Sequence, residues 1–150
     1  MTKSNRTWVA RLALACLVAV VMTGCAGVQR HKSKPMPTPE PGKGLVYFFG
    51  PSSFIGGGVQ MKISDAGKTI GALQSGTYFF YQTEPGTHQF GASTEAENTI
   101  TVNVEAGKTY YVEGSIGMGL LVGHGHLKEV DATVAHEELP KLDYATLPTH

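Results

Sequence analysis

Hydrophobic and polar residues alternate in two segments of the chain, 59–64 and 99–104, and such alternation is typical of strands with one buried face. Three segments are apolar or aromatic at consecutive positions, as expected of strands buried on both faces: 45–49, 77–81 and 109–112. Weaker strand patterns cover 68–73, 87–93 and 120–130. The pattern predicts an all-β fold, a single antiparallel β-sandwich of about seven or eight short strands.

Glycine-containing turns separate these predicted strands. Three turns place an acidic residue two positions before a glycine that can adopt positive φ: Asp65-Ala66-Gly67, Glu84-Pro85-Gly86 and Glu105-Ala106-Gly107. The letters AGKT occur twice, but Lys62 and Val102 stand where a phosphate-binding loop needs its first glycine. Only residues 133–139 predict a helix, a short C-terminal one that Pro140 ends.

The N-terminus has the pattern of a signal peptide. Lys3, Arg6 and Arg11 precede an uninterrupted apolar stretch, 12–22. As a helix, this stretch spans roughly 16 Å, well short of the ~30 Å hydrocarbon core of a bilayer. We therefore expect a removable signal peptide over residues 1–24 and no permanent transmembrane helix.

The end of this segment, Val21-Met22-Thr23-Gly24-Cys25, resembles the lipobox of bacterial lipoproteins. The resemblance implies cleavage between Gly24 and Cys25, diacylglycerol on the Cys25 thiol and a further acyl chain such as palmitate on the new amine. Ala26 follows instead of Asp, which by the same resemblance implies sorting to the outer membrane, facing the periplasm. Cys16 lies in the leader, so the mature chain would hold no disulfide.

Residues 25–43 are predicted to be the lipidated cysteine and a proline-rich tether. Four prolines stand at alternate positions, which favours polyproline II geometry: Pro35, Pro37, Pro39 and Pro41. Fully extended, such a tether reaches about 50 Å. Its basic residues would meet anionic headgroups or peptidoglycan carboxylates, or simply be solvated: Arg30, His31, Lys32 and Lys34. The sandwich domain is expected over 44–143, with a tail at 144–150.

The net charge of the predicted domain differs from that of the whole chain. The whole chain has 12 basic and 12 acidic residues. From Gly44 onward it has 5 basic and 11 acidic residues, a net charge of −6. Such a domain repels phosphate, so we expect no nucleic-acid partner.

The region 44–139 resembles the DUF2846 family, domains of unknown function found in predicted bacterial lipoproteins. The resemblance is carried by Pro51-Ser52-Ser53-Phe54-Ile55-Gly56-Gly57-Gly58, Ile70-Gly71-Ala72-Leu73, Ser75-Gly76-Thr77-Tyr78, Glu84-Pro85-Gly86-Thr87-His88 and Glu105-Ala106-Gly107-Lys108-Thr109-Tyr110-Tyr111-Val112. Segments 85–88 and 106–112 are also similar to PEGA-type surface modules, which are small β-sandwiches. Neither resemblance implies an active site or a cofactor.

One candidate binding site consists of two glycine-rich loops with apolar side chains. Its residues are Phe54, Ile55, Gly56, Gly57, Gly58, Met118 and Leu120. Their side chains either close one end of the sandwich or meet a partner, since loops on rigid strands commonly carry binding. If the loops lie side by side, they form one apolar patch.

One candidate metal site is the pair His124 and His126, whose imidazoles would share a strand face. The third donor would be His88, Glu113 or His136. Surface or hydrogen-bonded histidines are the alternative.

Catalytic motifs are absent from the sequence. The segment His136-Glu137-Glu138-Leu139-Pro140 is not HExxH, and Ser115 lacks the first glycine of a nucleophile elbow. The mid-strand tyrosines suit either sugar stacking or the core: Tyr47, Tyr78, Tyr81, Tyr110 and Tyr111. The sequence predicts a non-catalytic, lipid-anchored envelope protein that binds an envelope protein or peptidoglycan. The alternatives are a metal-binding lipoprotein and, less favoured, a hydrolase with a deep polar pocket.

Overall fold

A computed structural model describes residues 27–52, 58–93, 97–118 and 123–147. In chain order the secondary structure elements are β1 (Gln29–His31), β2 (Gly44–Gly50), β3 (Met61–Asp65), β4 (Lys68–Leu73), β5 (Thr77–Thr83), β6 (Gly86–Ser93), β7 (Glu97–Val104), β8 (Thr109–Met118), β9 (Gly123–Val130), α2 (Ala132–Glu138), the 3₁₀ turn η1 (Leu139–Lys141) and β10 (Asp143–Thr146). Each of the eight predicted strands is present.

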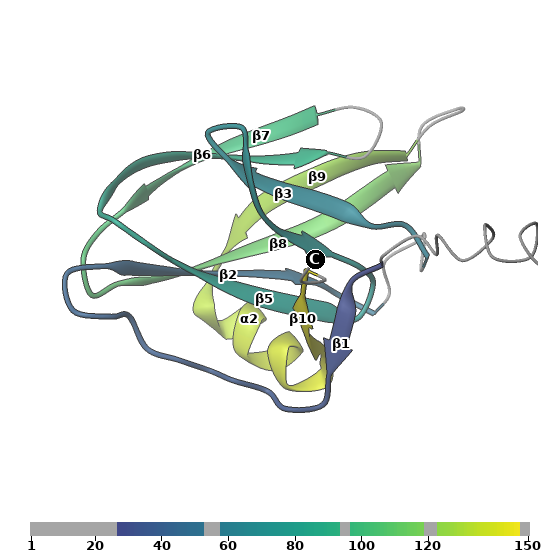
Figure 1. The fold of residues 1–150 in the computed structure, drawn as a ribbon, viewed down its shortest axis with the longest axis horizontal. Coiled ribbons are helices and arrows are strands. Elements are labelled where there is room, and N and C mark those ends of the chain that lie inside the picture. Colours follow the sequence, from purple (N-terminus) through teal and green to yellow (C-terminus); the bar gives the residue numbers. More distant parts are fainter. Residues whose placement is uncertain (1–26, 53–57, 94–96, 119–122, 148–150) are drawn as a thin grey trace, which may run out of the picture.

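The strands form two stacked sheets. A six-stranded sheet has the order β1-β10-β5-β2-β8-β9, and a four-stranded sheet has the order β4-β3-β6-β7. Figure 1 shows the four-stranded sheet on one side of the six-stranded sheet and α2 on the other. The predicted all-β sandwich with one short C-terminal helix is therefore confirmed.

The three consecutive apolar segments are the central strands β5, β2 and β8, and every residue of β2 is buried. Most strand pairs are antiparallel, but β2 pairs with β8 and β10 with β5 in parallel. The parallel pairing of β2 and β8 follows from the topology, because the chain crosses to the four-stranded sheet and returns between them. The purely antiparallel arrangement that the sequence predicts is corrected to this extent.

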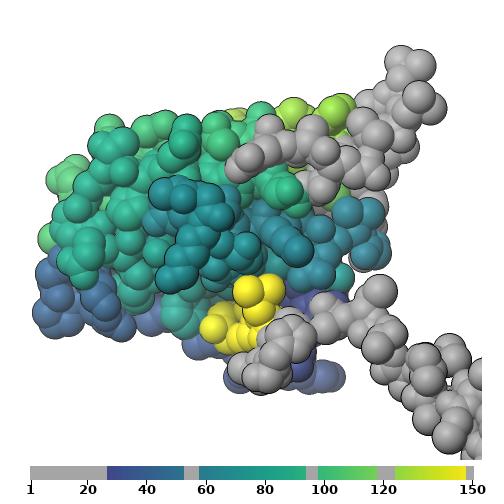
Figure 2. All heavy atoms as spheres, turned by 45° about the horizontal axis from the view of Figure 1, so that its top comes forward, coloured from purple at the N-terminus to yellow at the C-terminus, as the bar shows by residue number. Residues whose placement is uncertain are grey.

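Two strands lie where the sequence predicts none. β1 falls in the expected tether, and β10 falls in the expected tail except for its first residue, Asp143. The two strands pair with each other, with His31 opposite Tyr144. Figure 2 shows the last described residues, in yellow, on the same side of the molecule as the purple and blue N-terminal segment. The segment Gln29–His31 has no apolar alternation because it is the exposed edge of its sheet.

The helix differs from its predicted bounds by one residue at each end. α2 runs from Ala132 to Glu138, and Pro140 follows within η1. Because proline lacks an N–H group, it is tolerated in the first turn of this second short helix while it prevents α2 from continuing.

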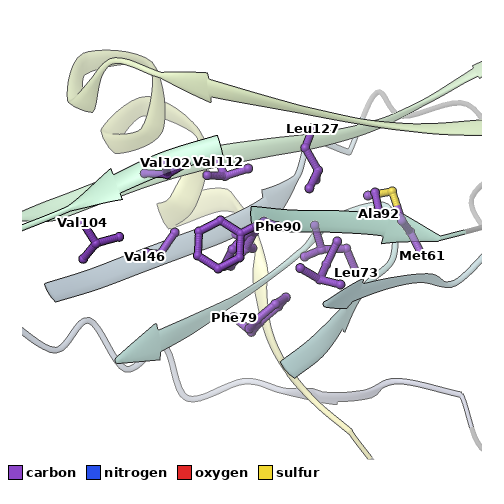
Figure 3. Packing of buried hydrophobic residues seen from close by; sticks show 12 residues of the cluster. Val46, Met61, Leu73, Phe79, Phe90, Ala92, Val102, Val104, Val112 and Leu127 are labelled. Atoms are coloured by element: carbon purple, nitrogen blue, oxygen red, sulfur yellow. The ribbon is translucent and has the colours of Figure 1, made fainter. Parts of the chain in front are cut away.

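The core between the two sheets is built around aromatic rings (Figure 3). Phe48 stacks on Phe79 at 5.0 Å between ring centroids, and Phe90 meets Phe48 edge-on at 5.0 Å. Gly71 packs so closely on the Phe79 ring that a Cβ there would lie 2.5 Å from Cε2. Burial of such rings is a main source of stability for a small β-sandwich.

A second core lies on the other face of the six-stranded sheet. It consists of Leu45, Tyr47, Phe49, Tyr78, Ala135, Leu139 and Leu142. Since α2 supplies Ala135, η1 supplies Leu139 and Leu142 follows η1 directly, the C-terminal segment is an integral part of the domain.

Candidate functional site

The outer face of the six-stranded sheet carries a continuous group of aromatic rings, which we call the aromatic face: Tyr47, Tyr78, Phe80, Tyr111 and Tyr144. Tyr47 stacks on Tyr111 at 5.6 Å, and Phe80 stacks on Tyr144 at 5.4 Å. The rings come from β2, β5, β8 and β10, so strand alternation places them on one surface.

A proline-rich segment, which we call the strap (residues 32–43), runs from β1 to β2 along this side of the sheet (Figure 1). Pro35, Pro37 and Pro39 are half-buried, whereas Met36 and Thr38 between them are exposed. These three prolines thus lie toward the domain and the residues between them face solvent, whereas Pro41 is exposed.

Side chains of the sheet hold the strap by its backbone. The Tyr78 hydroxyl donates to the Pro35 carbonyl at 3.0 Å, and the Tyr47 hydroxyl donates to the Pro37 carbonyl at 2.8 Å. The Gln82 side-chain amide donates to the Thr38 carbonyl at 3.0 Å, and its oxygen accepts the Glu40 N–H at 3.1 Å. Because a proline-rich backbone has few N–H groups and many free carbonyls, hydroxyl and amide donors are the groups that bind it.

Both ends of the strap are also fixed. Lys34 Nζ donates to the Pro140 carbonyl at one end. At the other, the Lys43 N–H donates to Glu40 O at 3.0 Å and the Gly107 N–H donates to Lys43 O at 2.8 Å. The domain therefore holds residues 29–43 along its own surface, where the sequence predicts an extended, proline-rich tether.

The environment of the aromatic face keeps the hydroxyl groups of Tyr47 and Tyr78 protonated, as hydrogen-bond donors must be. Burial, with Tyr111 and Tyr78 nearby, raises the pKa of Tyr47 to about 12. Burial, with Tyr144 nearby, raises the pKa of Tyr78 to about 12. Both phenols are therefore protonated donors at neutral pH, and neither is a general base.

The tyrosines are divided between the two faces of the sheet. Tyr47 and Tyr78 are 2% and 0% exposed beneath the strap, while Tyr81 and Tyr110 pack against the core between the sheets. The core interpretation is confirmed, and no open platform of these five rings exists for stacking a sugar.

Two histidines proposed as the third metal donor, His88 and His136, have other hydrogen-bond partners. His136 Nε2 lies 3.0 Å from the Tyr111 hydroxyl, on α2. His88 contacts Asp65 Oδ2 through Nδ1 and the Glu84 carbonyl through Nε2, each at 2.8 Å, and its ring stacks on Phe90. His88 and His136 are therefore each engaged by partners other than His124 and His126.

His124 and His126 share the outward face of β9, as the sequence predicts, because Gly125 between them is buried toward Met61. Glu113 shares that face on the neighbouring strand, opposite Lys128. In the ranges that the structure describes, no three His, Cys, Asp or Glu side chains are grouped to hold a metal ion. Metal binding by this pair stays a prediction.

A family model for DUF2846, a protein of unknown function, matches residues 40–126. The chain belongs to the DUF2846 family. A Haemophilus influenzae protein described as uncharacterized is 25% identical over 135 residues, which is 85% of this chain and 80% of that protein. No solved structure matches. The matched part of the DUF2846 domain contains β2 to β8, whereas β1, most of the strap, α2 and β10 lie outside it.

The loop residues predicted to bind a partner fall mainly outside the described residues of the DUF2846 domain. The loop residues outside the described ranges are Phe54, Ile55, Gly56, Gly57 and Leu120. The predicted cleavage and lipidation residues Gly24 and Cys25 also lie outside the described ranges. Gly58 is exposed, and Met118 ends β8. Since β2 and β8 are parallel neighbours, the C-terminal ends of these two strands lie at the same end of the sheet. A shared apolar patch stays a prediction.

Two surface hollows are formed by residues that the structure describes. One of about 430 Å³ is lined by Lys128, Glu129, Val130, Asp131 and Val134. Another of about 170 Å³ lies between β4, β5 and β10 and is lined mainly by apolar residues. Neither lining includes a histidine, serine or cysteine. Among the residues that the structure describes, no helix is long and apolar enough to cross a bilayer.

Sequence reasoning missed the most elaborate arrangement in this domain, the strap on the aromatic face. The signal was present in two parts, four alternate prolines and tyrosines at alternate faces of central strands. Gln82 carried no signal of its own, because a single glutamine in a strand is ordinarily a solvated residue.

Proposed function

We propose that this protein is a lipid-anchored envelope protein, attached through acylated Cys25 to the outer membrane and facing the periplasm. Its DUF2846 domain would act as a non-catalytic accessory or interaction module for an envelope protein or peptidoglycan. The observation that carries the anchoring is the segment Val21-Met22-Thr23-Gly24-Cys25 after a short apolar leader. Two or three acyl chains at about 0.8 kcal/mol per buried CH₂ hold a protein durably on a membrane.

The start of the folded domain just after Cys25 supports this proposal. β1 begins at Gln29, four residues after Cys25, so cleavage before Cys25 would remove the leader and leave every described element intact. The net charge of −6 from Gly44 onward and the absence of catalytic motifs support a protein-binding or wall-binding role over a nucleic-acid-binding or enzymatic one.

Labelling with palmitate in a two-membrane bacterium tests the anchor. We expect the native protein to incorporate label and its N-terminal peptide to begin at acylated Cys25. Cys25→Ser should abolish incorporation, whereas Cys16→Ser, a matched change inside the leader, should leave it intact. A native protein that takes up no label and retains residues 1–24 would contradict the proposal.

Crosslinking in intact cells tests the interaction role. Phe54→Ser with Ile55→Ser should remove the crosslinked partner if the glycine-rich loops bind it. The matched control is Val134→Ser with Leu147→Ser, since these two apolar residues are also exposed, at 42% and 38%. Identical crosslinks in both double variants would end the loop hypothesis.

A further inference from the structure

Basic side chains gather along β1 and the start of the strap, at one edge of the six-stranded sheet. Arg30, Lys32 and Lys34 lie within residues 27–34, which contain no acid, and Lys34 reaches across to Pro140, next to Lys141. Two acids lie at this edge: Asp143, 3.8 Å from Arg30, and Glu138, 2.9 Å from Lys141. Among the described residues, Lys32 and Lys34 form no ion pair, so this edge keeps a positive charge.

The docked strap determines how far this edge lies from the proposed anchor. Gln29 lies four residues after Cys25, and a fully extended chain spans about 14 Å over that length. A free tether of residues 26–42 would have allowed about 50 Å. The hydrogen bonds from Tyr47, Tyr78 and Gln82 remove most of that reach, because they hold the strap on the domain.

We infer that the β1 edge is the surface that the domain turns toward the membrane, where Arg30, Lys32 and Lys34 meet anionic lipid headgroups. This inference rests on the proposed acylation of Cys25. The charge distribution supports one orientation, because an anionic leaflet attracts the basic edge and repels the remainder, with 5 basic and 11 acidic residues from Gly44 onward. The short reach favours lipid over the cell wall, since the anchor keeps this edge beside the bilayer.

Energy transfer from two positions to a labelled lipid tests this orientation. The acylated protein is placed in vesicles of phosphatidylethanolamine and phosphatidylglycerol. Acylation consumes the Cys25 thiol, so Ser33→Cys or Thr101→Cys supplies the single reactive thiol for a donor dye. Both residues are exposed and uncharged, and β1 and β7 lie on opposite sides of the molecule (Figure 1). We expect transfer from position 33 to exceed that from position 101 several-fold, and equal transfer would overturn the inference.

A charge-matched pair of variants identifies the headgroup contact. Lys32→Gln with Lys34→Gln should reduce the difference between the two positions, as should replacing phosphatidylglycerol with neutral phosphatidylcholine. Lys62→Gln with Lys68→Gln makes the same change in net charge on the other sheet and should leave the difference unchanged. If both double variants behave alike, or if isolated peptidoglycan binds through Lys32 and Lys34 while vesicles do not, the lipid contact is wrong.

The mass of the N-terminal peptide, measured on the same preparation, separates the two proposals. A missing acyl group defeats the anchor itself. An acylated Cys25 with equal transfer from both positions defeats only the orientation.

Discussion

Two buried hydroxyl groups, those of Tyr47 and Tyr78, connect the sheet to the strap. A hydroxyl without a partner in such a site costs several kcal/mol, and each of these donates to a strap carbonyl instead. The same bonds satisfy a backbone that has few donors of its own, because alternate residues are proline. The tyrosines thus supply hydrogen-bond donors to the strap, and the strap supplies acceptors for the buried hydroxyl groups.

The raised pKa values of Tyr47 and Tyr78 predict a loss of stability at alkaline pH. In the unfolded chain a tyrosine loses its proton near pH 10, whereas in the folded protein these two keep theirs until about pH 12. Over this window the unfolded state binds fewer protons, so the free energy of unfolding falls as pH rises. The slope is at most about 1.4 kcal/mol per pH unit for each tyrosine. Urea unfolding followed by circular dichroism at several pH values measures it.

The variant with Tyr47→Phe and Tyr78→Phe is the control for this slope. It should be less stable than the native protein at neutral pH by about 1–3 kcal/mol, since two hydrogen bonds are lost. It should also lose much of the alkaline decline. An unchanged decline would assign it to other groups, such as Tyr111, whose pKa burial also raises.

The strap is an element without regular hydrogen bonding of its own, so its order depends on the sheet. Gln82 contributes two of its contacts, to Thr38 and Glu40. We expect Gln82→Ala to speed hydrogen exchange at the Glu40 amide and trypsin cleavage after Lys43, with a loss of global stability of only about 1–2 kcal/mol.

Gln89→Ala is the matched control for the strap, because Gln89 is exposed on β6 in the other sheet. It should change neither exchange nor cleavage. Equal protection of Glu40 in both variants would show that Gln82 does not hold the strap.

Elements with a buried apolar face were predictable from the sequence, whereas elements ordered by contact with a distant segment of the chain were not. The alternation at 99–104 and the apolar run at 45–49 located β7 and β2, because burial acts directly on those patterns. β1 and β10 carry no such pattern, since β1 is ordered by pairing with β10, and β10 by pairing with β1 and β5. The prolines indicated an extended strap but not its docking, because a sequence pattern shows that Tyr47 is buried without showing what covers it.

At the scale of the whole molecule, the six-stranded sheet belongs to both cores. Val46 and Phe48 on β2 face the core between the sheets, whereas Leu45 and Tyr47 face the core under α2. A change in one core is therefore transmitted to the other through strands that they share. We expect the domain to unfold in one cooperative transition.

A substitution at Leu142, in the core on the α2 side of the six-stranded sheet, tests this cooperativity. Its side chain is fully buried under the six-stranded sheet, and Leu142→Ala should lower the free energy of unfolding by about 2–5 kcal/mol through lost burial and a residual cavity. If the two cores unfold together, the slowest amides of β7, in the other sheet, should exchange faster by the same free energy. Leu147→Ala removes the same atoms from a side chain that is 38% exposed, and it should cost less than about 1 kcal/mol. Faster exchange confined to α2 and β10 in Leu142→Ala would instead mean that the C-terminal layer unfolds on its own.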